Sequence, residues 1–104
     1  MIEGLMRWYI DRCDGEWEHK NGFTIESTDN PGVIIRLDLT ERDPLAGQPD
    51  RVIRSEGEGT SEWLDLRVRG GQLVGFASPI LLPQLMTEID CLLSGAHSQS
   101  DLPS

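Results

Sequence analysis

The chain is short and strongly acidic. Its 104 residues predict a single domain with one modest core, and nine Lys and Arg against eighteen Asp and Glu give a net charge of -9 at pH 7. Binding of nucleic acid requires cations that displace counterions from phosphate, so this charge argues against a nucleic-acid partner and favours basic protein partners. No segment is long and apolar enough to predict a membrane span, and no membrane partner is expected.

The cysteines and the N-terminal residues indicate the compartment. Cys13 and Cys91 are too few for the disulfide framework of a small secreted protein. Each lies on the apolar stripe of a predicted helix, so we expect both thiols to be reduced and slow to react. Residues 1–7 include an acid and no long apolar run, which is not the pattern of a signal peptide. These features predict a cytoplasmic protein.

Residues 2–13 show helical spacing of apolar side chains and predict an amphipathic helix that ends near Gly15. Its apolar stripe comprises Ile2, Leu5, Met6, Tyr9 and Cys13. Trp8 lies off this stripe, so we expect it either to make a second contact or to cover the edge of the core.

Residues 13–19, Cys-Asp-Gly-Glu-Trp-Glu-His, have neither helical nor strand spacing and predict a loop. One interpretation of this acidic heptapeptide is a solvated turn after the helix. The other is a binding site, because loops rich in acidic and aromatic side chains often carry function. The candidate partner-binding residues in it are Asp14, Glu16, Trp17, Glu18 and His19.

The acidic heptapeptide also contains potential metal ligands and a thiol near an imidazole. Zinc sites usually combine two ligand pairs, and the other histidine of the chain, His97, lies far away near the C-terminus. A nucleophilic Cys13 would need a cationic setting, whereas carboxylates surround it here. We therefore expect no metal, no cofactor and no catalysis. The alternative is a small ligand- or metal-binding domain that uses the Cys13–His19 cluster.

Residues 22–40 change to alternating spacing around Asp29-Asn30-Pro31-Gly32, which predicts a β-hairpin. A loop of odd length centred on Asn30 sets the register. The predicted opposite pairs are Ser27 with Val33, Ile25 with Ile35, and Phe23 with Leu37. This register makes one face of the hairpin apolar throughout, as burial of that face requires.

The rest of the chain predicts a weak strand, a second hairpin and a helix. Residues 41–61 are rich in Pro, Gly, Asp, Glu and Ser, with a short edge strand expected at Val52-Ile53. Residues 62–78 alternate around a Gly70-Gly71 turn and predict a hairpin. The side chains of Leu73, Gly75 and Ala77 then share a face with Leu66, and those of Val74 and Phe76 lie near Trp63 on the other face. Residues 83–94, from Pro83 to a cap at Gly95, predict the final helix.

This order predicts an α+β fold, an antiparallel sheet of four to five strands with N-terminal and C-terminal helices packed on one face. We expect one domain over residues 1–95 and a mobile polar tail over residues 96–104. On the opposite sheet face, Ile34, Trp63, Val74 and Phe76 stand among charged side chains. Such a face is either a contact surface, including one for a self-associating structural domain, or is covered by residues 41–61.

A series of motifs runs from the first predicted helix towards the last. They are Trp8-Tyr9, the acidic heptapeptide, Gly22, the Asp29-Asn30-Pro31-Gly32 turn, Leu37-Asp38-Leu39 and Glu62-Trp63. In this order, the motifs resemble the immunity protein 53 family of bacterial polymorphic toxin systems. The resemblance covers most of the chain.

The resemblance implies a small cytosolic protein that binds a cognate toxin and neutralises it by occluding its active surface, without catalysis. Many toxin domains are nucleases with basic grooves, and an acidic partner suits such a groove. Partner-binding candidates outside the acidic heptapeptide are Asp29, Asn30, Asp38 and Trp63. We expect the heptapeptide to lie beside the Asp29–Gly32 turn, because the first strand starts directly after it, and Trp17 to be the apolar anchor.

Overall fold

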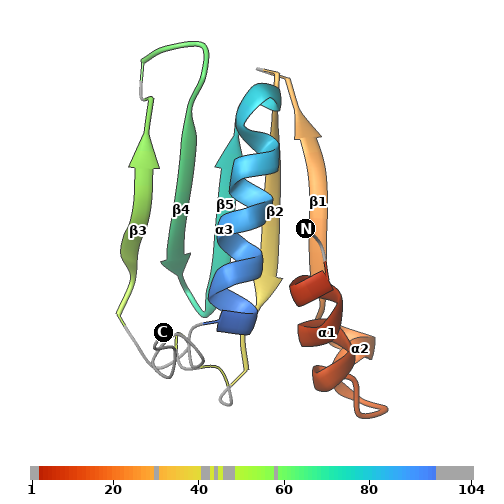
Figure 1. Ribbon diagram of the computed structural model, residues 1–104. Helices are drawn as coiled ribbons and strands as arrows, with labels where there is room; N and C mark the ends of the chain where they lie inside the picture. The colour runs from red at the N-terminus through yellow and green to blue at the C-terminus, as the bar shows by residue number, and fades with distance from the viewer. Residues whose placement is uncertain are drawn as a thin grey trace.

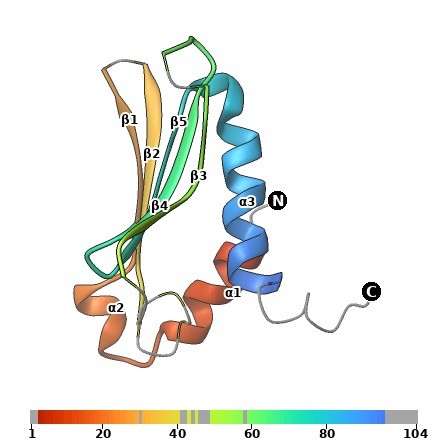
Figure 2. The same cartoon turned by 90° about the vertical axis from the view of Figure 1, so that its left-hand side faces the viewer.

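Two helices lie on one side of a five-stranded sheet in the computed structural model, which describes residues 3–29, 31–40, 43, 45, 49–57 and 59–95 (Figures 1 and 2). The chain order is α1 (Glu3–Arg12), α2 (Trp17–Lys20), β1 (Phe23–Thr28), β2 (Gly32–Asp38), β3 (Arg51–Glu56), β4 (Leu64–Arg69), β5 (Gln72–Ala77), the 3₁₀ helix η2 (Pro79–Leu81) and α3 (Leu82–Gly95). The predicted α+β class and the placement of the terminal helices are confirmed.

The sheet is antiparallel throughout and has the strand order β1-β2-β5-β4-β3. Two hairpins, β1–β2 and β4–β5, join through the β2–β5 pair, and β3 adds to the far edge. The turn of the second hairpin lies at Gly70 and Gly71, whose φ values of 57° and 82° are the left-handed conformation that glycine adopts at low cost. Both predicted turns are in place, although Asn30 itself lies outside the described residues.

The core lies between the sheet and the helices α1 and α3 (Figure 2). Alternate residues of the strands point into it, as the two-residue period requires. Its buried members are Leu5, Trp8, Ile35, Leu37, Leu64, Leu66, Val68, Leu73, Ala77, Leu85, Met86 and Ile89. Helix α3 approaches the sheet at Gly75, where a Cβ atom would meet Leu85 Cδ1 at 2.9 Å. Glycine at that position therefore permits the close packing of helix on sheet.

The register of the first hairpin is confirmed, but its apolar face is not buried throughout. Ile25 lies on the helix-facing side of β1 and is 46% exposed. The reason is the limited width of the helical layer. Helix α3 packs mainly on β5 and β4. Helix α1 lies near the beginning of β1 (Figure 1). There Tyr9 contacts Phe23, with ring centroids 5.2 Å apart. The middle of the edge strand is therefore left uncovered.

Most of the described part of residues 41–61 does not fold over the other sheet face, where Gly59 and Thr60 line a pocket beside Trp63 and Phe76. This segment contributes strand β3, which extends the sheet and confirms the predicted edge strand around Val52-Ile53. We call the side of the sheet that points away from α1 and α3 the open face. The tail at residues 96–104 lies outside the described residues. Among the described helices, none has the length and apolar character needed to cross a membrane.

Candidate functional site

The acidic heptapeptide was expected to form an irregular loop, and this expectation is wrong. A one-turn helix, α2, begins at Trp17. Asp14 Oδ1 accepts hydrogen bonds from the N–H groups of Glu16 and Trp17, both at 2.9 Å. In return, the Glu18 carboxylate accepts from the N–H groups of Asp14 at 2.9 Å and Gly15 at 2.8 Å. Together these bonds satisfy four backbone N–H groups just before and at the start of α2.

These hydrogen bonds favour the ionised form of the Glu18 carboxylate. Its own backbone N–H and those of Asp14 and Gly15 stabilise the carboxylate, so the pKa of Glu18 lies below its usual range. Two of the three carboxylates in the acidic heptapeptide are therefore engaged in building the turn. Glu16 and His19 are exposed at its surface.

Trp17 is half-buried and packs against the first helix. Its ring lies edge-on to Trp8 at a centroid distance of 5.7 Å and is tilted against Tyr9 at 5.9 Å. Tyr9 in turn contacts Phe23 at the start of β1. Aromatic pairs in this geometry contribute beyond the area that they bury. These four rings tie α2 to α1 and to the sheet.

A buried acid that the sequence analysis missed binds to side chains of α1, next to these four rings. Asp43 is 7% exposed, and its carboxylate accepts hydrogen bonds from Trp8 Nε1 at 2.9 Å, Thr40 N at 2.8 Å and the guanidinium of Arg12. Burial opposes ionisation of Asp43, but the bonds from Arg12, Thr40 and Trp8 outweigh it and hold the pKa below its usual range. Trp8 is thus a core residue, 4% exposed.

The spacing of Trp8 and Arg12 was the available signal for this network. The two residues are four apart, so they share a helix face, and Arg12 lies over the Trp8 ring at 5.5 Å. Both lie off the apolar stripe that the sequence predicts. A buried indole N–H beside a guanidinium calls for an acid, although the sequence does not show which one.

Asp38, at the end of β2, links the residue before β1 to the first residue of β5. Its Oδ2 accepts from Gly22 N at 2.9 Å, and its Oδ1 accepts from Gln72 Nε2 at 2.8 Å. A shallow pocket of about 320 Å³ lies beside it, with Lys20 and Arg36 among its lining residues. Asp38 therefore lies at the same end of the sheet as the acidic heptapeptide.

The expectation that the acidic heptapeptide lies beside the Asp29–Gly32 turn is wrong. Strand β1 has six residues, and the heptapeptide and the turn lie at its opposite ends (Figure 1). The candidate residues therefore fall into two groups. Asp29 is exposed at the turn, where Gly32 approaches the Trp63 ring closely enough that a Cβ atom would lie 3.0 Å from Trp63 Cη2.

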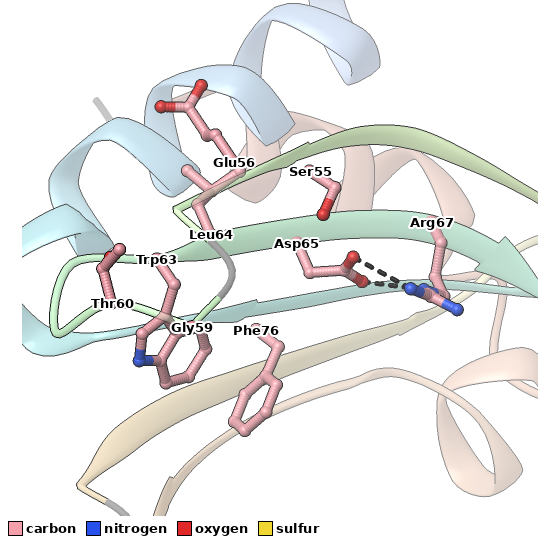
Figure 3. Close-up of a pocket in the computed structure, with 9 residues that line it drawn as sticks. All are labelled: Ser55, Glu56, Gly59, Thr60, Trp63, Leu64, Asp65, Arg67 and Phe76. Carbon is pink, nitrogen blue, oxygen red and sulfur yellow. Dashed lines mark hydrogen bonds and ion pairs between the residues drawn. The ribbon is translucent and has the colours of Figure 1, made fainter.

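Trp63 stands on the open face beside Phe76 of β5, with ring centroids 4.5 Å apart in an edge-to-face arrangement (Figure 3). Both rings are half-buried. The predicted neighbourhood of Trp63 and Phe76 is confirmed. They line a shallow pocket of about 450 Å³. Its remaining lining residues are Ser55, Glu56, Gly59, Thr60, Leu64, Asp65 and Arg67.

The floor of this pocket carries an ion pair. Arg67 Nε and Nη2 donate to the two carboxylate oxygens of Asp65 at 2.7 and 2.9 Å (Figure 3). The bonds from Arg67 lower the pKa of Asp65, and they raise the pKa of Arg67 itself. A bidentate pair of this kind holds both side chains in fixed orientations. The pocket therefore combines an aromatic wall with a charged, oriented floor.

The thiols and the potential metal ligands do not converge. Cys13 is half-buried, whereas Cys91 is exposed, so the expected packing of Cys91 on an apolar stripe is wrong; on α3 it lies two positions beyond the buried Ile89. Within the described part of the chain, no group of three or more His, Cys, Asp and Glu side chains is placed to hold a metal ion.

The comparisons with known proteins identify the family of this chain. A search of curated proteins and a search of solved structures each find no match. The family model of immunity protein 53 matches residues 2–92. This match spans α1, all five strands of the sheet and α3 as far as Leu92. The chain therefore belongs to the immunity protein 53 family.

Proposed function

We propose that this immunity protein binds a cognate toxin in the cytoplasm and neutralises it by covering the toxin's active surface, with no turnover. The observation that carries the contact surface is the aromatic pair Trp63 and Phe76 on the open face. Within the described part of the chain, α1 and α3 lie on the other side of the sheet from these two large apolar rings (Figure 3). Exposed apolar groups with a polar rim are typical of protein interaction sites.

The open face has the composition of an interface centre. Ile34 and Val74 adjoin Phe76 in the sheet, and both are half-buried. Charged pairs surround this centre, with Arg67–Asp65 on one side and Arg36–Glu26 on the other. Aromatic anchors usually supply most of the binding energy, while rim charges act mainly on the rate of association.

The net charge of -9 supports a basic toxin surface, such as the substrate groove of a nuclease. Opposite charges steer two proteins together and raise the association rate, and salt reduces this effect. We therefore expect the association rate to fall as ionic strength rises. A rate that is independent of salt contradicts a basic contact surface on the toxin.

The role of the acidic heptapeptide in binding stays a prediction. Asp14, Trp17 and Glu18 are engaged within the fold, which leaves Glu16 and His19 as its exposed members. These side chains lie at the far end of the sheet from Trp63. A toxin large enough to span the open face is needed to contact both groups at once.

The test compares two tryptophans, with the protein encoded immediately upstream as the candidate toxin. We expect Trp63→Ala to raise the dissociation constant by about 30-fold or more, equivalent to the ~2 to 4 kcal/mol of a buried aromatic anchor. We expect Trp17→Ala to lower the free energy of unfolding by about 2 kcal/mol, because Trp17 packs on Trp8 and Tyr9. Its folded fraction should keep the wild-type affinity.

Isothermal titration calorimetry and chemical denaturation on the same samples separate the two effects. A toxin activity assay with increasing immunity protein should show full inhibition at a fixed stoichiometry. Unchanged affinity in folded Trp63→Ala contradicts the proposed contact surface. Failure of the wild-type protein to bind or inhibit the upstream product contradicts the proposed function itself.

A further inference from the structure

The two edge strands of the sheet differ in how they are protected. Strand β3 has an irregularity between Val52 and Arg54, and Arg54 pairs with Glu56 and Glu88. Bulges and charges of this kind discourage a further strand from pairing. Strand β1 pairs with β2 in continuous register over six residues, and its one charged side chain is Glu26. Its edge therefore lacks the irregularity of β3 and carries a single charged side chain, which pairs with Arg36 of β2.

The hydrogen-bonding groups on the outer edge of β1 follow from its pairing with β2. Asp38 N donates to Gly22 O at 2.9 Å, which places this pair at a hydrogen-bonded position of the ladder. In an antiparallel ladder these positions alternate, so every second residue from Thr24 onwards bonds to β2 and the residues between direct their backbone groups outwards. The outward residues are Phe23, Ile25 and Ser27.

We propose that β1 pairs antiparallel with β1 of a second copy of this chain, about a twofold axis at Ile25. The two sheets would then continue into one another through a symmetric pair of edges. This proposal does not depend on the toxin complex, because that complex uses the open face and the dimer uses the edge. Within the described part of the chain, β1 pairs with β2 alone.

The side chains favour this register. Ile25 is 46% exposed on the helix-facing side, and the twofold axis places it against Ile25 of the second copy. Each backbone N–H and C=O of Ile25 finds its counterpart, since both copies direct these groups outwards. Glu26 then lies opposite Thr24. A shift of the axis by one residue to Glu26 sets two like charges opposite one another, which is destabilising.

A second copy and a toxin strand at this edge would differ in how their binding depends on salt concentration. Each copy has a net charge of -9, so the two copies repel one another at low ionic strength. We expect dimerisation to strengthen as salt rises from about 20 to 300 mM. A toxin complex between acidic and basic surfaces should weaken over the same range. The sign of the salt dependence therefore distinguishes the two associations.

Disulfide trapping tests the register directly in a background without Cys13 and Cys91. Residues at the twofold axis have Cα atoms about 5.5 Å apart, within the range that a disulfide spans. Ile25→Cys should therefore give a cross-linked dimer on mild oxidation. Ser27→Cys is the matched control, because in this register its two copies lie about 13 Å apart along the strands. Cross-linking of both variants, of neither, or of Ser27→Cys alone overturns the proposal.

Equilibrium sedimentation of charge variants tests the edge without a covalent bond. Ile25→Lys sets two ammonium groups opposite one another and should raise the dimer dissociation constant about tenfold or more. Val52→Lys is the matched control, since Val52 is 50% exposed on the other edge strand. A monomeric wild-type protein overturns the proposal. So does a dimer that survives Ile25→Lys, or toxin binding that is lost with Ile25→Lys while the wild type shows no dimer.

Discussion

The acidic heptapeptide and the open face differ in what their side chains contact. In the heptapeptide, Asp14 and Glu18 accept backbone hydrogen bonds, and Trp17 packs against the rings of the first helix. On the open face, Trp63 and Phe76 contact one another and line a pocket that is open to solvent. The heptapeptide has the composition of a binding site, whereas the open face has the geometry of one. The sequence shows which chemical groups a segment contains. Whether those groups can bind a partner protein depends on the contacts that they already make within the fold.

The charged side chains of the two regions also differ in what they contact. The carboxylates near the heptapeptide hold backbone and buried groups, and Asp43 is the most deeply placed of them. The charges of the open face pair across or along strands, as Glu26 does with Arg36 and Asp65 with Arg67. Removal of the first kind should therefore affect folding, and removal of the second kind should affect association.

Replacement of Asp43 should have the largest effect on stability. Asp43→Ala leaves Trp8 Nε1 and the guanidinium of Arg12 without their acceptor, and we expect the free energy of unfolding to fall by about 3 kcal/mol. Toxin affinity of the folded fraction should stay unchanged, because Asp43 contacts α1 and not the open face. Urea denaturation measures the loss, with Asp29→Ala at an exposed acid as the control. Equal stability of the two variants would contradict the structural role of Asp43.

Acid should weaken the same corner by a smaller amount. The folded-state pKa of Asp43 lies below its usual range, and the unfolded value is about 3.9. The stabilisation is therefore complete above about pH 4 and is lost as pH falls through the folded pKa. Thermal denaturation between pH 6 and pH 2 should show a decline that is shallower in Asp43→Asn. A parallel decline in both proteins contradicts this assignment.

Loss of the capping aspartate should cost less again. Asp14→Ala removes the acceptor for the N–H groups of Glu16 and Trp17, and caps of this kind contribute about 1 kcal/mol. Glu16→Ala is the matched control, since the Glu16 side chain is exposed at the same turn. Melting temperatures of the two variants provide the comparison. If Glu16→Ala lowers toxin affinity and leaves stability unchanged, the acidic heptapeptide is part of the toxin-binding surface.

The smallest effect on stability is expected from the rim. Glu26→Gln breaks the exposed pair with Arg36, and such pairs contribute roughly 0.2 to 1 kcal/mol to folding. Its main consequence should be a slower association with the toxin at low salt. Stopped-flow association rates at two ionic strengths measure this. An unchanged rate at low salt would remove Glu26 from the contact rim.

Alternation and turn chemistry predicted the sheet well because both are local. The pairing of Phe23 with Leu37 follows from the two-residue period and the length of the loop, and the structure has it. The exposure of Ile25 does not follow, since it depends on how far the helices extend across the sheet. The Trp8–Asp43 bond joins residues 35 apart, and Asp43 lies in a segment without periodicity. The short helix α2 had a usable signal in the spacing of Asp14 and Glu18.

The position of the toxin on the immunity protein can be measured directly. Hydroxyl-radical footprinting of the immunity protein, free and saturated with the upstream toxin, reports the solvent access of both half-buried tryptophans in a single sample. We expect Trp63 and Phe76 to become protected in the complex, with oxidation of Trp17 unchanged. Protection of Trp17 and His19 with Trp63 still reactive would place the toxin on the acidic heptapeptide and contradict the account.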